Sequence, residues 1–253
     1  MSKGAPVRHL ERIDWSPSPF DPPDLDSWPL SIPAIAALIE AGGMDVQPGV
    51  TFLIGENGTG KSTLIEALAA VYPRQGFESS HARVSGPPPS VEDSLMPRHL
   101  RARTHPLASP AGFFLRAEAM HSYLADVDSD PRQLRAWGGE QMQTRSHGES
   151  FLAVLRHRFA EVGVYFMDEP EAALSFRSCL GLVSLLYQMA MEGSQVIIAT
   201  HSPLLASLPG ATLLELGEWG MRAVASYDEL ELVQKWRDFI GAPERYLRYL
   251  FDD

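Results

Sequence analysis

The sequence is poor in cysteine and in lysine. Cys179 is the single cysteine, so no disulfide bond can form within the chain. A single thiol, in a sequence without the cysteine pattern typical of proteins from oxidising compartments, indicates a buried side chain in a cytosolic protein. Of the 21 basic residues only Lys3, Lys61 and Lys235 are lysines, and the others are arginines. A chain this biased towards arginine that keeps Lys61 weakly favours a chemical role for that ammonium group.

Long hydrophobic runs are also missing. The most apolar stretches, residues 32–39 and 183–191, are far shorter than a membrane span. Residues 1–10 contain no apolar core of signal-peptide length. We therefore expect a cytoplasmic protein with no direct membrane insertion, whose role at a membrane, if it has one, goes through a partner.

Positive charge is in deficit, since the formal net charge is -11. This argues against a protein that coats nucleic acid by its overall charge, but it leaves room for a local basic groove. The segment Arg98–Arg103, together with His105, forms such a local cluster. A solvated loop is the ordinary interpretation of it, and contact with nucleic acid or a protein partner is the alternative.

Apolar segments alternate with segments of helical periodicity along the chain. Residues 50–54, 162–167 and 195–200 predict buried strands, and residues 62–72 and 174–191 predict helices. Residues 211–216 and 221–226 predict a hairpin, whereas residues 14–33 and 73–110 predict mostly irregular structure. Apolar strands between helices predict an α/β fold with a parallel sheet covered on both faces. Ligands of such sheets bind at the carboxyl ends of the strands.

A glycine-rich loop lies between the first predicted strand and its helix. It fits the pattern G-x-x-x-x-G-K-[ST] with Gly55, Glu56, Asn57, Gly58, Thr59, Gly60, Lys61 and Ser62, and Thr63 follows it. Glycines let backbone N–H groups turn inward around phosphate oxygens, and the following helix points its positive N-terminus at them. Lys61 is then expected to reach the β- and γ-phosphates, and the Ser62 hydroxyl to bind Mg²⁺. A simple glycine turn is the alternative.

Two acids end the second predicted strand. Adjacent side chains point to different sides of an extended chain, so Asp168 can serve the Mg²⁺ shell while Glu169 faces an attacking water. A plain strand-to-turn exit is the alternative for this pair taken alone. His201 follows the third predicted strand, and we expect it at a neighbouring strand end near the same phosphate.

Residues 146–149 fit a helix start. Ser146 and Glu149 have the spacing of a capping box, which is the plainer interpretation. A capped helix N-terminus with a serine hydroxyl and the neighbouring Gly148 also suits a γ-phosphate. The loop at residues 55–62 already surrounds one side of the phosphates, so we expect Ser146 and Gly148 to close over nucleotide on a second subunit.

The order and rough spacing of these motifs over residues 45–217 resemble an ABC-type ATPase, and within that class the stand-alone bacterial predicted ATPases of the AAA-ATP-binding group. Residues 55–63 resemble the Walker A loop, residues 165–169 resemble Walker B with its catalytic glutamate, and residues 200–203 resemble the switch-histidine loop. Residues 146–149 stand where that family has its signature motif, and residues 171–175 stand at its D-loop.

The sequence departs from the family at several positions. His147 stands in place of the first signature glycine, and Ser175 in place of the D-loop aspartate. Glu118 is the nearest candidate for the Q-loop position, with a solvated helix acid as the alternative, and Trp28 is the candidate for stacking on adenine.

The resemblance implies one P-loop NTPase domain over residues 1–253. It implies a small helical subdomain at about residues 74–160, and residues 227–253 suggest a helical tail. It further implies ATP and Mg²⁺ as ligands, an ATP-dependent homodimer, and hydrolysis that drives a conformational switch. Catalytic roles fall on Glu169, His201 and Lys61. The rivals are the nucleotide-binding subunit of a membrane transporter and a P-loop small-molecule kinase, which would need neither the Ser146 helix nor His201.

Overall fold

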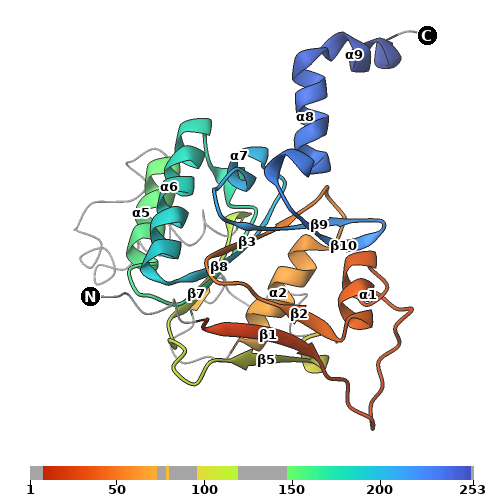
Figure 1. Ribbon diagram of the computed structural model, residues 1–253, viewed down its shortest axis with the longest axis vertical. Coiled ribbons are helices and arrows are strands. Elements are labelled where there is room, and N and C mark those ends of the chain that lie inside the picture. The colour runs from red at the N-terminus through yellow and green to blue at the C-terminus, as the bar shows by residue number, and fades with distance from the viewer. Residues whose placement is uncertain (1–7, 73–77, 80–95, 119–146, 252–253) are drawn as a thin grey trace.

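The computed structural model describes residues 8–72, 78–79, 96–118 and 147–251 of the chain (Figure 1). Within them the main sheet has the strand order β10-β9-β3-β8-β7-β6-β4. Its strands are β3 (Val50–Ile54), β4 (Glu78–Ser79), β6 (Gly112–Arg116), β7 (Val164–Asp168), β8 (Gln195–Thr200), β9 (Thr212–Gly217) and β10 (Gly220–Val224). All neighbouring pairs run parallel except β9 and β10, which form an antiparallel hairpin at one edge.

Helices cover both faces of this sheet, as the apolar strands predict. Phe52, Tyr165 and Ile198 belong to a core packed by α5 (His147–Arg158) and α6 (Phe176–Glu192). The next residues along the same strands, including Leu53 and Phe166, belong to a second core packed by α1 (Pro33–Glu40) and α2 (Lys61–Val71). Strands buried on both sides are therefore mostly apolar, with polar residues such as Gln195 and Asp168 at their ends, and this is why the apolar runs predicted them.

The strand predictions at 50–54 and 195–200 agree with β3 and β8. The prediction at 162–167 begins too early, because Val162 is exposed and β7 starts at Val164. The predicted hairpin corresponds to β9 and β10, and the predicted helices at 62–72 and 174–191 correspond to α2 and α6.

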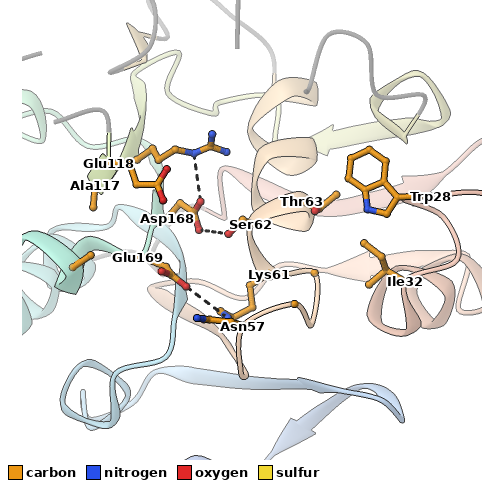
Figure 2. A pocket seen from close by; sticks show the side chains of 14 residues that line it. Trp28, Ile32, Asn57, Lys61, Ser62, Thr63, Ala117, Glu118, Asp168 and Glu169 are labelled. Atoms are coloured by element: carbon orange, nitrogen blue, oxygen red, sulfur yellow. Dashed lines mark hydrogen bonds and ion pairs between the residues drawn. The ribbon is translucent and has the colours of Figure 1, made fainter. Parts of the chain in front are cut away.

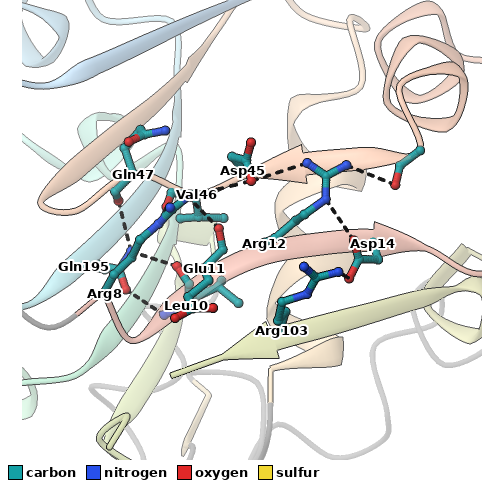
Figure 3. A network of polar contacts seen from close by, with 11 residues as sticks. Arg8, Leu10, Glu11, Arg12, Asp14, Asp45, Val46, Gln47, Arg103 and Gln195 are labelled. Carbon is teal, nitrogen blue, oxygen red and sulfur yellow. Dashed lines mark hydrogen bonds and ion pairs between the residues drawn. The ribbon is translucent and has the colours of Figure 1, made fainter. Parts of the chain in front are cut away.

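A second, antiparallel sheet was not predicted. It has the order β2-β1-β5, with β1 (Leu10–Trp15), β2 (Gly43–Asp45) and β5 (Leu100–Thr104). Its exposed face carries charges. Oδ1 of Asp14 lies 2.8 Å from Nε of Arg12, and Oδ2 of Asp14 lies 2.8 Å from Nη2 of Arg103 (Figure 3). Because charged residues occupy alternate positions, these segments lack the continuous apolar run that predicts a buried strand. Their strand conformation becomes evident only from the pairing of β1 with β5.

Gln195 joins the two sheets. Its fully buried amide accepts a hydrogen bond from Leu10 N at 2.7 Å and donates to the carbonyls of Leu10 and Gln47, each at 3.0 Å (Figure 3). A buried amide with both ends satisfied costs little and fixes one arrangement of its partners. The N-terminal sheet is thereby held beside the start of β8.

The segment predicted as a helical subdomain contains strands as well as a helix. β5 pairs with β1 and β6 pairs with β7, so both belong to the sheets described above. Residues 119–146 lie outside the described residues, and the helical subdomain therefore stays a prediction.

The last part of the chain forms α8 (Glu231–Gly241) and α9 (Pro243–Phe251), which extend from the body of the molecule (Figure 1). A short η4 (Tyr227–Glu229) precedes them. The helices meet at Ala242, and α9 begins at Pro243. Across the described parts of the chain, every helix is too short or too polar to span a bilayer.

Candidate functional site

The glycine-rich loop runs from the end of β3 at Ile54 to the start of α2 at Lys61. Gly58 and Gly60 have φ angles of 84° and 91°, which disfavour any residue with a side chain. Gly60 is also the N-cap of α2, and among the described residues no side chain caps that helix. Its first backbone N–H groups are therefore available to an anion, and the helix dipole favours one there.

Lys61 is buried in this loop. Its side chain is 3% exposed, and Nζ donates a hydrogen bond to the carbonyl of Glu56 at 2.9 Å. Nζ also lies 3.7 Å from Oε1 of Glu169. Burial lowers the pKa of Lys61, while the carboxylates of Glu169, Asp168 and Glu171 act in the opposite direction. A phosphate at this position would supply the compensating negative charge.

Ser62 and Asp168 meet across the loop. The Ser62 hydroxyl donates to Oδ1 of Asp168 at 3.0 Å, and Asp168 is 6% exposed (Figure 2). Burial raises the pKa of the Asp168 carboxyl, and the Ser62 hydrogen bond and Arg116 oppose that shift. A hydroxyl and a carboxylate at one strand edge fit Mg²⁺, which prefers oxygen ligands and takes the rest from phosphate and water. Among the described residues, no three or more His, Cys, Asp or Glu side chains lie close enough together to hold a metal ion by themselves.

Glu169 adopts a left-handed backbone conformation with φ 46°, unlike every other non-glycine residue that the structure describes. Its N–H donates to the Ala199 carbonyl at 2.9 Å, so the strained turn is tied to β8. This turn sends the Glu169 side chain away from Asp168 and towards Lys61 and His201. Oε1 lies 3.3 Å from Nδ1 of His201, and the Glu169 side chain stays 30% exposed.

Lys61, Ser62, Asp168 and Glu169 line one end of a cavity of about 420 Å³, a size typical of small-ligand sites, and His201 reaches this cavity only through its contact with Glu169. Trp28 and Ile32 line the other end (Figure 2). Of the predicted loop residues, those on this cavity are Asn57, Gly58, Gly60, Lys61, Ser62 and Thr63. Gly55, Glu56 and Thr59 line a second cavity on the side of Lys235, whose Nζ contacts Oε1 of Glu56 at 2.7 Å.

The predicted signature residues are not brought to this cavity by the described part of the chain. Ser146 lies outside the described residues. Gly148, in the first turn of α5, packs against α6: a Cβ at this position would meet Oγ of Ser178 at 2.4 Å.

Arg116 is a residue of this site that the sequence motifs do not indicate. It ends β6 in register with Asp168, and its Nε lies 3.5 Å from Oδ2 of that residue. It also forms an ion pair with Glu66 of α2 and lines the cavity. Its position at a strand end is the signal in the sequence that points to it, and the Q-loop candidate Glu118 lines the same cavity two residues later (Figure 2).

Fold and site together define a P-loop nucleotide-binding protein. A protein family described as "AAA domain, putative AbiEii toxin, Type IV TA system" matches residues 150–207. The "Vitamin B12 import ATP-binding protein BtuD" of Yersinia enterocolitica is 30% identical over 60% of this chain and 66% of its own length. The "Ribose import ATP-binding protein RbsA 1" of Streptomyces avermitilis is 27% identical over 81% of this chain and 42% of its own length. By its motifs and these matches the chain is similar to ABC-type ATP-binding proteins.

The first curated relatives are longer proteins, of which the chain spans about a third to two fifths. Among solved structures, the cbiO1 protein of Clostridium perfringens aligns with a TM-score of 0.46 at 17% identity, over 83% of this chain and 90% of its own. The SMC head domain of Thermotoga maritima aligns with a TM-score of 0.47 at 15% identity, over 85% and 98%.

Proposed function

We propose that the chain binds MgATP in the cavity between Trp28 and Glu169 and hydrolyses it to drive a conformational switch. The observation that carries this proposal is the meeting of Ser62 with Asp168 at 3.0 Å, beside Lys61 and Glu169. A phosphate-binding loop, a pair of oxygen ligands and a candidate base thus converge on one end of a cavity. An aromatic ring lies at the other end, where a base would stack.

Each residue has a role in this proposal. Lys61 and His201 neutralise charge on the γ-phosphate, and Glu169 polarises the attacking water. Ser62 and Asp168 would hold Mg²⁺, which when bound neutralises the β- and γ-phosphate oxygens. Arg116 holds the second oxygen of Asp168 and so orients that carboxylate. Phosphoryl transfer depends mainly on positioning and electrostatics, which suits a site made of charges and helix dipoles.

We further propose that ATP joins two copies of the chain, with the start of α5 of one copy closing over the γ-phosphate held by the other. The support is the exposure of Glu169 and His201, whose side chains are 30% and 45% exposed and so open to a second protein surface. A helix N-terminus brought to the γ-phosphate gains charge-assisted hydrogen bonds that ADP cannot offer.

The decisive experiment is phosphate release from ATP by the purified chain with and without Mg²⁺. Lys61→Ala is the matched control, because it keeps the backbone of the loop and removes its ammonium group. Mg²⁺-dependent phosphate release by the wild type, with no such release by Lys61→Ala, supports the proposal. Equal release by the two proteins, or none by either, contradicts it.

The relatives' names favour one second candidate, the nucleotide-binding subunit of an importer, because BtuD and RbsA 1 are named as import ATP-binding proteins. That function requires a separate membrane subunit, and a permease gene beside this one would support it. A nuclease or repair gene there would favour a nucleic-acid switch acting through Arg98–Arg103. In that segment Arg103 is already paired with Asp14 at 2.8 Å, which competes with phosphate contacts.

A P-loop small-molecule kinase ranks last. Such a kinase transfers the phosphate to an acceptor and would not need an imidazole next to the candidate base, whereas His201 and Glu169 are 3.3 Å apart here. Phosphate release to water in the absence of any acceptor separates the two reactions.

A further inference from the structure

Glu171 contacts the loop that carries His201. It lies in the short η3 turn (Pro170–Ala173) that follows Glu169. Its Oε1 accepts a hydrogen bond from the Thr200 hydroxyl at 2.5 Å and another from the backbone N–H of His201 at 2.9 Å. The same oxygen is 3.5 Å from Nδ1 of His201. One carboxylate oxygen therefore contacts three polar atoms in two consecutive residues.

The burial of this carboxylate is costly. The Glu171 side chain is only 8% exposed, and within the described part of the chain its Oε2 is buried without a hydrogen-bond partner. A buried charged group with one unsatisfied oxygen destabilises a fold unless its other contacts are worth more. The contacts that compensate are those made to Thr200 and His201.

The Thr200 hydroxyl extends the same chain of contacts. It donates to Glu171 and accepts from the N–H of Ser202 at 3.0 Å, and Ser202 in turn caps α7 (Pro203–Ala206) through Leu205 N. The end of β8, the His201 turn and the start of α7 are thus fixed to the turn after β7. A carboxylate on Nδ1 also favours a hydrogen on that nitrogen and sets the ring orientation.

We propose that Glu171 is a positioning residue, which holds the Thr200–His201 turn so that Nδ1 of His201 meets Glu169. The inference rests on the proposed function for its kinetic consequence, since His201 must act in hydrolysis for its position to matter there. The placement itself does not depend on hydrolysis. Removal of the acceptor should therefore misplace the imidazole whether or not nucleotide is present.

Steady-state kinetics test the catalytic part. Glu171→Ala should lower kcat by about 10- to 100-fold, the usual effect of losing such a supporting contact, with KM changed less than about two-fold. Glu171→Gln should keep kcat within about three-fold of wild type, because the amide carbonyl still accepts from Thr200 and from His201 N. The exposed Glu192→Ala is the matched control and should leave kcat unchanged.

A double-mutant cycle shows whether Glu171 acts through His201. In the His201→Ala background, adding Glu171→Ala should lower kcat by less than about two-fold, because the group being positioned is already gone. A further loss as large as in the wild-type background overturns the proposal. So does a Glu171→Ala enzyme with wild-type kcat, and so does a Glu171→Gln enzyme as impaired as Glu171→Ala.

Histidine nitrogen NMR without nucleotide tests the placement independently. The His201 ring resonances, assigned by their loss in His201→Ala, should shift in Glu171→Ala and stay close to wild type in Glu171→Gln. If these shifts occur in a chain that releases no phosphate, the positioning holds and the proposed hydrolysis fails. If His201 is unchanged in Glu171→Ala while the wild type hydrolyses ATP, the positioning inference alone is wrong.

Discussion

Nδ1 of His201 lies 3.3 Å from Oε1 of Glu169, and the two side chains come from the ends of adjacent parallel strands, β8 and β7. The pair stands beside Lys61, whose Nζ is 3.7 Å from the same carboxylate oxygen. The Lys61 ammonium group and the His201 ring thus both lie beside the Glu169 carboxylate, which is 30% exposed. We therefore expect turnover to depend on Glu169 and His201.

Glu169→Gln should bind MgATP with an affinity close to wild type and hydrolyse it about 10²- to 10⁴-fold more slowly, since a positioned general base contributes a factor of that size. His201→Ala should also slow turnover while largely sparing binding. Isothermal titration gives the affinities, and a coupled phosphate assay gives the rates. Glu169→Gln turning over at the wild-type rate would remove that residue from the mechanism.

Trp28 lines the cavity at the end opposite Glu169 and is 63% exposed, so its ring is accessible to a base (Figure 2). Trp28→Ala should weaken MgATP binding by about 1–3 kcal/mol, the contribution of one base stacked on an aromatic ring. Trp28→Phe should recover most of the lost binding free energy. Trp236→Ala on α8 is the control, and an unchanged affinity in Trp28→Ala would place the base elsewhere.

Glu169→Gln should form a dimer with ATP and not with ADP, because a partner's α5 N-terminus requires the γ-phosphate. Sedimentation velocity at saturating nucleotide measures this. A chain that stays monomeric with ATP contradicts the shared site.

Mixing two inactive chains tests the same dimer through activity. Lys61→Ala and Gly148→Asp chains should each be inactive, and their mixture should recover one working site per heterodimer. Because a side chain at Gly148 meets Oγ of Ser178, the second chain should also carry Ser178→Gly, and Ser178→Gly alone should stay active. No recovered turnover in the mixture would leave Gly148 as a packing residue of α5 and α6.

Two buried tyrosines predict the response to alkaline pH. Burial raises the pKa of Tyr72 and of Tyr165 to about 12, from 10.0. A raised pKa in the folded state means that stability is complete below pH 10 and is lost as pH rises towards 12, by up to about 3 kcal/mol for each tyrosine. Tyr72→Phe should show a shallower fall in the free energy of unfolding over that range. Denaturant titrations at pH 8 to 11 measure it, and equal slopes would contradict the assignment.

The sequence by itself determined the strand, loop and helix around residues 50–71, because apolar runs, glycine conformations and helical spacing are local properties. It also indicated that Asp168, Glu169 and His201 stand at strand ends. The contacts of Arg116 with Asp168, of Glu171 with the His201 turn and of β1 with β5 were decided only by the tertiary structure. Each joins residues distant in the chain, and strand order and register, which periodicity does not encode, bring them together.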